Sequence, residues 1–368
     1  MSIETLDFYK NNKNLWKWHF RDPALRISLL EILESLSADD LIRNIDKREV
    51  YHKNKIFVKF YTPSKNTFRK KTQEFLFPSA VQEFKQLLRL LEKNIPAVTP
   101  LAFGRCGMKS VLITQEEPDI SSMEQILLQI QNCGGKVPDT LLSSWGAFIK
   151  KIIDEKIYFA DFHQGNLLYS ARKNNFVIVD PLGMKSVLHL RKVRLLRMLK
   201  RQTSWLLEFG SKKDLLRLLS EISPGKSEQL YEELLNYSSY YVRKLQLPKR
   251  IKRFRKNKFT KDNIQYNDRF DRKCLDDCVK INLQSDVAEE VWERDYMCSL
   301  HFLPMLHAVA RCPGSGIIYR QKNGTQVVSA EDKMILLQRL KICKLPEDLF
   351  SFITDEYGRT VLIDRELL

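Results

Sequence analysis

The segment from Tyr158 to Gly183 constrains the fold more than any other part of the chain. It contains two apolar runs, N-L-L-Y and F-V-I-V-D, which a polar turn separates. Short apolar runs on either side of such a turn predict a β-hairpin. Because a hairpin brings the ends of its strands together, we expect Asp161, Asn166 and Asp180 to lie at one end of it.

The spacing of these three residues suits phosphoryl transfer. An Asp in a loop can accept the proton of an attacking hydroxyl group, and an Asn and a second Asp offer hard oxygen ligands to Mg²⁺. The pattern D-x-x-x-x-N, followed by a hairpin and an Asp that closes an apolar strand, is typical of a kinase catalytic loop and its metal-binding Asp. The alternative is a polar hairpin in which these side chains only cap turns.

A second hairpin is predicted over residues 48–61, where apolar and polar side chains alternate on both sides of a polar turn. Val58 and Phe60 then share one face of the second strand, and Lys59 points to the other. A lysine in the middle of a strand is either solvated or a buried ligand of phosphate.

A helix is predicted to open at Ser79, where Ser79 and Gln82 have the spacing of a capping box. Its apolar stripe consists of Val81, Phe84, Leu87, Leu88 and Leu91. Glu83 lies beside this stripe. A strand lysine followed by a helical glutamate is the arrangement that fixes the phosphate-binding lysine of a kinase through an ion pair. A solvated surface glutamate is the alternative.

The strand predicted at residues 110–115 is interrupted by E-E-P-D. In a two-lobed nucleotide kinase, the linker after such a strand offers backbone groups to adenine. Residues 115–119 are therefore the predicted hinge, and Gln115, Glu116 and Glu117 are the predicted nucleotide-binding residues of this segment.

Composition indicates a folded protein with an anionic partner. The 368 residues exceed the size at which one hydrophobic core keeps growing, so two or three lobes are expected. The net charge of +16 points to nucleotide, nucleic acid or an acidic membrane surface. The seven cysteines show neither the spacing of a zinc site nor a disulfide framework, which favours a reducing, cytosolic compartment. No apolar run approaches the length of a membrane span, so we expect any membrane contact to be peripheral.

Several flanking segments carry structural expectations. Residues 1–40 are predicted to be helical, and the aromatic and basic run 15–21 either packs on the next lobe, which we favour, or lies in a lipid headgroup region. Helices are expected over 191–209 and 212–222. The run 249–258 is the most basic in the chain and could bind phosphates of nucleic acid or lipid, or form a solvated helix or linker.

Taken in order, these motifs resemble a known family. The strand lysine, S-A-V-Q-E-F-K-Q-L-L-R-L-L-E-K-N-I-P-A-V-T-P-L-A-F-G, A-D-F-H-Q-G-N-L-L-Y and V-I-V-D-P are similar to the bacterial lipopolysaccharide-core kinases of the Kdo/WaaP type. The resemblance covers roughly residues 45–260. It implies an α+β, two-lobed protein-kinase-like fold with an N-terminal helical extension (1–40), an N-lobe (41–115), a C-lobe (116–258) and an appended C-terminal region (259–368).

The resemblance also implies roles for individual residues. Lys59 would contact the α- and β-phosphates of ATP and Glu83 would hold Lys59, while Asp161 would be the catalytic base and Asn166 and Asp180 the ligands of Mg²⁺. The sequence departs from the pattern at two places. Phe159 stands where a histidine is usual, and no glycine-rich loop precedes the lysine.

The implied function is ATP- and Mg²⁺-dependent phosphorylation of a sugar hydroxyl in the lipopolysaccharide inner core, either Kdo or heptose. The protein would be cytoplasmic and peripheral on the anionic inner membrane, with nucleic acid not expected as a partner. A kinase for another small molecule or for protein remains an alternative, as does a basic pseudokinase scaffold that binds nucleic acid or membrane.

Overall fold

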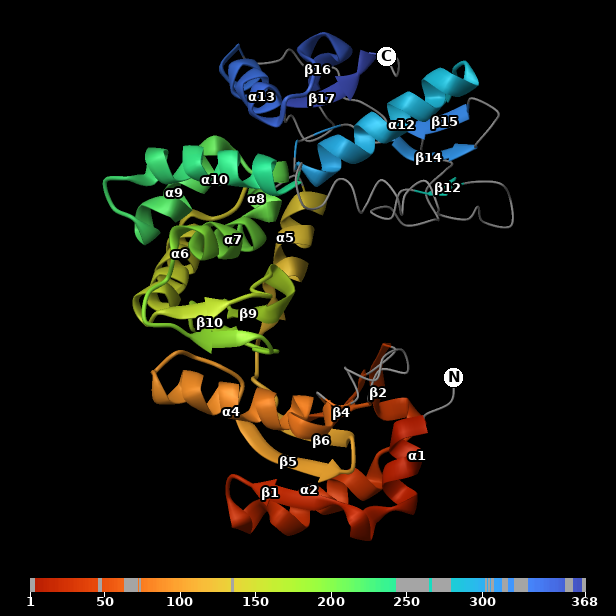
Figure 1. Ribbon diagram of the computed structural model, residues 1–368, viewed down its shortest axis with the longest axis vertical. Coiled ribbons are helices and arrows are strands. Elements are labelled where there is room, and N and C mark those ends of the chain that lie inside the picture. Colours follow the sequence, from red (N-terminus) through yellow and green to blue (C-terminus); the bar gives the residue numbers. More distant parts are fainter. Residues whose placement is uncertain are drawn as a thin grey trace. The chain divides into compact units, whose positions relative to one another are not determined.

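The computed structural model in Figure 1 describes residues 4–45, 48–62, 72, 74–133, 136–242, 265–266, 279–301, 303, 305, 308–312, 317–320, 330–354 and 360–365. The chain separates into two units. Unit 1 consists of Met1–Leu128 and Ala147–Arg191, and unit 2 of Gln129–Gly146 and Lys192–Leu368. Both units contain helices and antiparallel sheets, which confirms the α+β class. The domain boundaries proposed from the sequence stay a prediction.

Unit 1 is built on a six-stranded antiparallel sheet with the strand order β1-β5-β6-β4-β3-β2. The strands are β1 (Lys17–Phe20), β2 (Leu41–Ile45), β3 (Arg48–Lys53), β4 (Ile56–Tyr61), β5 (Pro100–Cys106) and β6 (Lys109–Gln115). The helices α1 (Glu4–Asn11) and α2 (Arg26–Ser35) lie on one face of this sheet, and α4 (Ser79–Glu92) lies on the other (Figure 1).

The two faces of the sheet differ in chemistry. Val58 and Phe60 of β4 are fully buried in an apolar cluster with Tyr9 of α1 and Leu33 of α2. Because successive side chains of a strand point to opposite faces, Lys59 points toward the α4 side instead. The alternation in the sequence predicted this division, and the structure confirms it.

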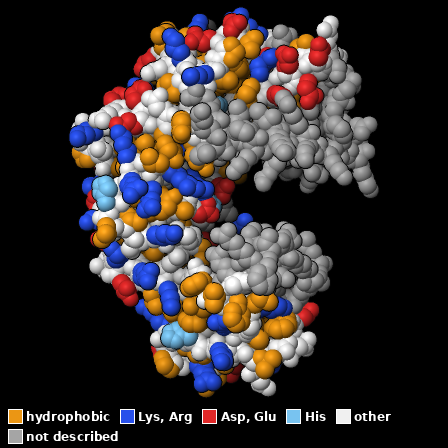
Figure 2. All heavy atoms as spheres, viewed as in Figure 1, with side chains coloured by type: hydrophobic (Ala, Val, Ile, Leu, Met, Phe, Trp, Pro, Cys, Tyr) orange, Lys and Arg blue, Asp and Glu red, His pale blue; other side chains and the backbone are white. Residues whose placement is uncertain are grey.

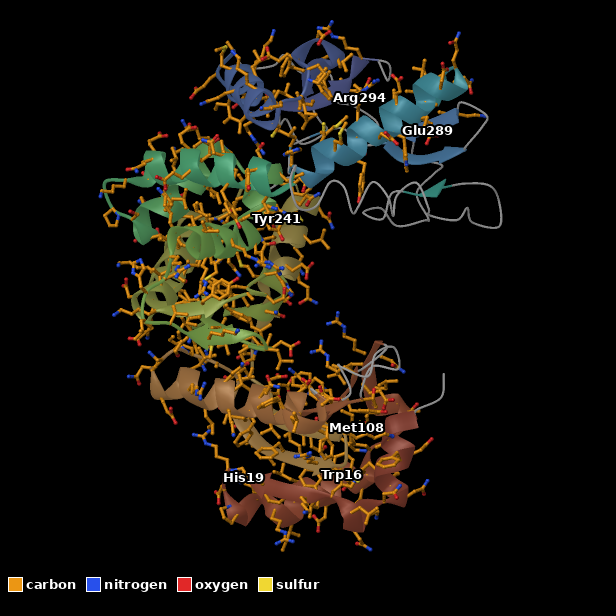
Figure 3. All side chains as sticks on the ribbon, in the orientation of Figure 1. Trp16, His19, Met108, Tyr241, Glu289 and Arg294 are labelled. Atoms are coloured by element: carbon orange, nitrogen blue, oxygen red, sulfur yellow. The ribbon has the colours of Figure 1, made fainter. Side chains whose placement is uncertain are left out.

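The prediction that residues 1–40 are helical is wrong for β1. This strand pairs with β5, and its side chains alternate between the two faces of the sheet. Trp18 stacks on Phe20 and on Trp16. Trp16, labelled in Figure 3, is buried in the apolar cluster. His19 lies on the other face, against Phe103 and Phe84. The aromatic rings thus pack on the sheet, as favoured above.

The start of α4 also differs from the prediction in its capping. The helix does begin at Ser79, but the hydroxyl and the N–H group of Ser79 both donate to the Glu74 carboxylate. The Gln82 amide donates to the carbonyl of Phe77. The expected capping box is absent because a preceding acidic side chain satisfies the first turn of the helix.

A second set of strands in unit 1 holds the polar hairpin. The hairpin consists of β9 (Leu167–Ser170) and β10 (Asn175–Ile178), and β7 (Ser121–Ser122) pairs with β9. Ile178 also forms a bridge with Ala97, just after α4. The strand β8 (Ile157–Phe159) precedes the hairpin in sequence and β11 (Met184–Ser186) follows it, and these two strands pair with each other. The predicted hairpin is confirmed, and it is tied to the end of α4.

Unit 2 contains a helical layer and a mixed C-terminal part. Its helices include α7 (Lys192–Gln202), α8 (Ser204–Phe209), α9 (Lys212–Ile222) and α10 (Ser227–Tyr241). The helix predicted over 191–209 is interrupted at Thr203, whereas α9 has the predicted bounds. The helices α5 (Met123–Asn132) and α6 (Asp139–Asp154) have residues in both units.

Among the C-terminal residues, the helix α13 (Ala330–Cys343) packs against α10. These residues also form α12 (Ser285–Leu300), a sheet of β12 (Gln265–Tyr266), β13 (Val279–Asn282), β14 (Ala308–Cys312) and β15 (Ile317–Arg320), and a hairpin of β16 (Phe350–Thr354) and β17 (Thr360–Asp364). Ser239 of α10 donates to the carbonyl of Ile342. Arg294, labelled in Figure 3, forms an ion pair with the buried Asp364.

Surface charge is widespread. On the face that Figure 2 draws, Lys and Arg side chains are distributed over the described surface. The basic run 249–258 lies outside the described residues. Among the residues that are described, no helix combines the length and the apolar character needed to cross a bilayer.

Gly104 provides a test of the pairing between β1 and β5. It pairs with Trp18, and a Cβ atom at position 104 would lie 2.8 Å from the indole ring. We expect Gly104→Val to destabilise the protein by about 1–3 kcal/mol, as overpacking does. Denaturant unfolding measures this loss. In a Trp18→Ala background the loss should become much smaller, and an equal loss in both backgrounds would contradict the packing of β1 on β5.

Candidate active site

Lys59 and Glu83 form a buried ion pair in unit 1. Lys59 Nζ lies 2.7 Å from Glu83 Oε1, and the Glu83 side chain is inaccessible to solvent. The glutamate reaches this position because it lies on α4 beside the apolar stripe that packs against the sheet, where Phe84 and Leu87 are buried. The structure therefore contains the pair that the strand and helix patterns predict.

Tyr61 adds a second hydrogen bond to this glutamate. Its hydroxyl group donates to Glu83 Oε2. Tyr61 follows Lys59 by two residues on β4, so the two side chains share one face of the sheet. The sequence analysis did not identify Tyr61 as a site residue, although the period-two pattern that placed Lys59 also places this tyrosine.

Asp180 connects the ion pair to the hairpin. Its Oδ1 atom lies 3.2 Å from Lys59 Nζ, and its Oδ2 atom accepts a hydrogen bond from the guanidinium of Arg48. The backbone of Asp180 has φ of +53°, in the left-handed region that non-glycine residues rarely adopt. Backbone strain of this kind persists where the surrounding structure enforces it, and it is common at functional sites. Arg48 was also missed by the sequence analysis.

The charges in this network stabilise one another. Burial alone would raise the pKa of the Asp180 carboxyl group, but Lys59 and Arg48 outweigh it and hold this pKa well below its usual range. Burial would lower the pKa of Lys59, and the carboxylates of Glu83 and Asp180 instead raise it. Burial raises the pKa of the Glu83 carboxyl group, and the positive charge of Lys59, which acts in the opposite direction, does not fully offset this effect. Lys59 and Asp180 are therefore both charged at neutral pH.

Two hydrogen bonds hold Asp161 and Asn166 beside the segment that ends in Asp180. The Asn166 side-chain amide donates to the carbonyl of Asp161 at 3.0 Å, and the N–H group of Val179 donates to the carbonyl of Asn166 at 3.1 Å. Asn166 is buried, whereas the Asp161 side chain is 56% exposed. The structure thus brings the three predicted polar residues to one end of the hairpin.

Phe159, the departure from the usual histidine, is part of an aromatic stack. Its ring lies 5.3 Å from that of Phe162, and both side chains are buried. These rings flank Asp161 in sequence and anchor the backbone on both sides of it. Phe159, where a histidine is usual, therefore stabilises the loop by packing against Phe162.

His163 and Glu124 border the same loop. His163 Nδ1 accepts a hydrogen bond from the N–H group of Gly165, and its Nε2 atom lies 4.0 Å from Asp161 Oδ2. A Cβ atom at position 165 would lie 2.7 Å from Glu124 Oε2, so only glycine fits there without displacing that carboxylate. The sequence analysis assigned neither side chain a role. His163 was visible within D-F-H-Q-G-N, whereas Glu124 comes from α5 and carried no local signal.

The predicted hinge follows β6 without interruption. The N–H group of Gln115 donates to the carbonyl of Thr99, and that of Glu116 donates to the carbonyl of Lys55. The Glu116 carboxylate lies 3.1 Å from His52 Nε2. Two of the three predicted nucleotide-binding residues thus use their N–H groups within the fold. The N–H group of Glu117 has no backbone acceptor among the described residues.

A divalent cation would find oxygen ligands at the end of the hairpin. Among the described residues, no three His, Cys, Asp or Glu side chains cluster as a self-sufficient metal site. Asp180 offers a carboxylate, and the Asn166 amide nitrogen is already committed to the loop, which leaves its oxygen for a ligand. Mg²⁺ is usually held by one or two protein ligands together with substrate phosphates and water. The donor set therefore fits Mg²⁺ bound with a nucleotide.

The chain matches the model of the lipopolysaccharide kinase (Kdo/WaaP) family over residues 43–237, which is more than half of its length. It belongs to this family. The match includes the six-stranded sheet from β2 onward, the ion network of Lys59, Glu83 and Asp180, and the loop that holds Asp161 and Asn166. The protein is accordingly a kinase, a phosphotransferase that acts on a hydroxyl group, and not only a scaffold. The resemblance stated from the motifs is confirmed.

The chain also has weak structural similarity to two solved proteins, WaaP and WbdD. WaaP in complex with acyl carrier protein is 16% identical, with 62% of this chain and 97% of that chain covered at a TM-score of 0.46. WbdD, described as a bifunctional kinase-methyltransferase, is 13% identical over 51% of this chain and 47% of that chain, at a TM-score of 0.36. No curated protein matches the chain.

The buried hydroxyl group of Tyr61 should contribute to the stability of this site. Tyr61→Phe removes one hydrogen bond from a buried carboxylate, so we expect a loss of about 1–3 kcal/mol in the free energy of unfolding. Tyr169→Phe is the matched control, because its hydroxyl group donates to Asn174 at the surface. Chemical denaturation of both variants makes the comparison. Equal effects would show that the Tyr61 hydroxyl does not support Glu83.

Proposed function

We propose that the protein transfers the γ-phosphoryl group of ATP, with Mg²⁺, to a sugar hydroxyl of the lipopolysaccharide inner core. The observation that carries this proposal is the buried network of Lys59, Glu83 and Asp180, which hydrogen bonds connect to Asn166 and Asp161. Such an arrangement supports the proposal, because a kinase needs a phosphate-binding lysine, metal ligands and a proton acceptor close together. Family membership supports lipopolysaccharide as the acceptor class.

Lys59 binds the α- and β-phosphates in this proposal. The buried carboxylate of Glu83 holds the ammonium group at a fixed place, and the hydroxyl of Tyr61 fixes that carboxylate in turn. A charge that is already oriented needs no reorganisation when the phosphates arrive. At the other end of the nucleotide, the N–H group of Glu117 and the carbonyls of residues 115–117 would contact adenine.

Asn166 and Asp180 would hold Mg²⁺, which neutralises charge on the phosphate oxygens when it is bound. Asp180 is ionised at neutral pH, since neighbouring cations keep its pKa low. Asn166 is fixed by its bond to the Asp161 carbonyl. One loop thus positions both a metal ligand and the catalytic base.

Asp161 accepts the proton of the acceptor hydroxyl. The sugar oxygen forms a bond to the γ-phosphorus, the bond from that phosphorus to the β,γ-bridging oxygen breaks, and the proton passes to the Asp161 carboxylate. The products are ADP and a phosphorylated sugar. The exposure of the Asp161 side chain is consistent with direct access by a large acceptor.

The basic composition suits a phosphorylated glycolipid acceptor in an anionic leaflet. Each Lys or Arg near such a surface contributes about 1 kcal/mol of attraction, which decays within a Debye length. A net charge of +16 can therefore concentrate the enzyme at the cytoplasmic face of the membrane as a peripheral protein. The basic run 249–258 is one candidate for this contact, and it lies outside the described residues.

Replacing the catalytic base tests the chemical step. Asp161→Asn should lower turnover about 10²–10⁴-fold, which is the usual contribution of general base catalysis, and should leave the dissociation constant of ATP nearly unchanged. Asp154→Asn is the control, because this aspartate pairs with Lys150 at the surface. Retention of more than about a tenth of wild-type turnover by Asp161→Asn would exclude its role as the base.

The acceptor class is tested with the wild type and the Asp161→Asn variant. Wild type and Asp161→Asn are incubated with labelled ATP and separate pools of extracted lipopolysaccharide, proteins and small sugars. We expect label in lipopolysaccharide with the wild type alone, and mild acid hydrolysis followed by mass spectrometry of the core then distinguishes Kdo from heptose. Labelling of only the protein or small-sugar pool would replace this proposal with a kinase of the corresponding class.

A further inference from the structure

The connection that would carry a glycine-rich loop is very short in this protein. In the N-lobe of a kinase, that loop joins the two strands that precede the strand with the phosphate-binding lysine, and it covers the phosphates with backbone N–H groups. In this protein the lysine strand is β4, so the corresponding strands are β2 and β3. Here β2 ends at Ile45 and β3 begins at Arg48, so only Asp46 and Lys47 connect them, and neither is glycine. Two residues cannot supply a flap of backbone donors over a triphosphate. Another group must bind the phosphates that Lys59 does not reach.

Arg48 lies where such a group is needed. It is the first residue of β3 and pairs with Tyr61, while Val50 pairs with Lys59. Residues opposite each other on antiparallel strands share a face, so the Arg48 side chain projects on the same side of the sheet as Lys59. The ion pairs of both cations with Asp180 establish that their charged ends lie close together.

The two cations differ in how firmly they are held. Lys59 has two carboxylate partners, since it also binds the buried Glu83. For Arg48, Asp180 is the single carboxylate partner among the described residues, and the guanidinium also hydrogen-bonds Tyr61. If Asp180 becomes a metal ligand, Arg48 is the cation that loses its anion. The polyphosphate of the nucleotide would then be the nearest replacement.

We propose that Arg48 binds the β- and γ-phosphates of the nucleotide and replaces the glycine-rich loop with a side chain. The planar guanidinium group offers several N–H donors and binds phosphate oxygens in pairs. In the nucleotide-free protein, Asp180 holds Arg48 in position, so the arginine exchanges one anion for another upon binding. This inference rests on the proposed function and deepens it, because it names the residue that binds the terminal phosphates of the nucleotide.

Calorimetric titration tests this role through binding and not through turnover. Wild type, Arg48→Gln and Arg48→Lys are titrated with ATP, adenosine and tripolyphosphate, each with Mg²⁺. Arg48→Gln should weaken ATP and tripolyphosphate binding about 10- to 100-fold, as expected for a charge-assisted hydrogen bond, with adenosine affinity unchanged. Arg48→Lys keeps the positive charge but lacks the paired N–H donors. Its affinities for ATP and tripolyphosphate should therefore lie between those of the wild type and those of Arg48→Gln. Arg89→Gln removes an exposed arginine from α4 and should change none of these affinities.

The outcomes separate this inference from the proposed function. If the wild type binds ATP and both Arg48 variants bind ATP within about twofold of it, the inference is wrong and the kinase proposal stands. Equal weakening of adenosine and ATP would also overturn it, because it would indicate distortion of the whole pocket. Circular dichroism confirms that each variant is folded, and Arg48→Lys provides the comparison if Arg48→Gln does not fold. Failure of the wild type to bind ATP would contradict the proposed function itself.

Discussion

A charged lysine in the interior of unit 1 is the feature on which the rest of the site depends. Removing an ammonium group from water costs several kcal/mol unless anions and hydrogen bonds compensate for it. Lys59 receives this compensation from Glu83 and Asp180, which come from a helix and from the end of a hairpin. The lysine therefore requires both elements to be in place, and its ion pairs connect the sheet with the end of the hairpin.

Packing keeps these elements in register. The apolar stripe of α4 fixes the helix on the sheet and thereby fixes Glu83. After the helix, the N–H group of Val98 donates to the carbonyl of Ile178, and the N–H group of Ile178 donates to the carbonyl of Pro96. This exchange joins the end of α4 to the strand that leads into Asp180. The position of Asp180 is thus coupled to the position of the helix through backbone hydrogen bonds.

The sequence predicted the parts of the site that follow a local period or a recognisable spacing. Alternation placed Lys59 on the inner face of β4, and D-x-x-x-x-N with the hairpin placed Asn166 and Asp180 together. Arg48 was not predicted, because its role depends on a contact with a residue far along the chain. The strand β1 was mistaken for part of a helical segment, since four residues of alternating pattern are too few to outweigh the helical segments on both sides. Its partner β5 was needed to reveal it.

A crystal structure with Mn²⁺ and a non-hydrolysable ATP analogue would test most directly whether the ion network is a nucleotide and metal site. Mn²⁺ can replace Mg²⁺ and is located by its anomalous scattering. The account predicts a metal peak about 2.1 Å from oxygens of Asn166 and Asp180, with phosphate oxygens completing its coordination and Lys59 still paired with Glu83. A metal and nucleotide bound elsewhere, with the Lys59 to Asp180 contact intact and no phosphate beside it, would contradict the account.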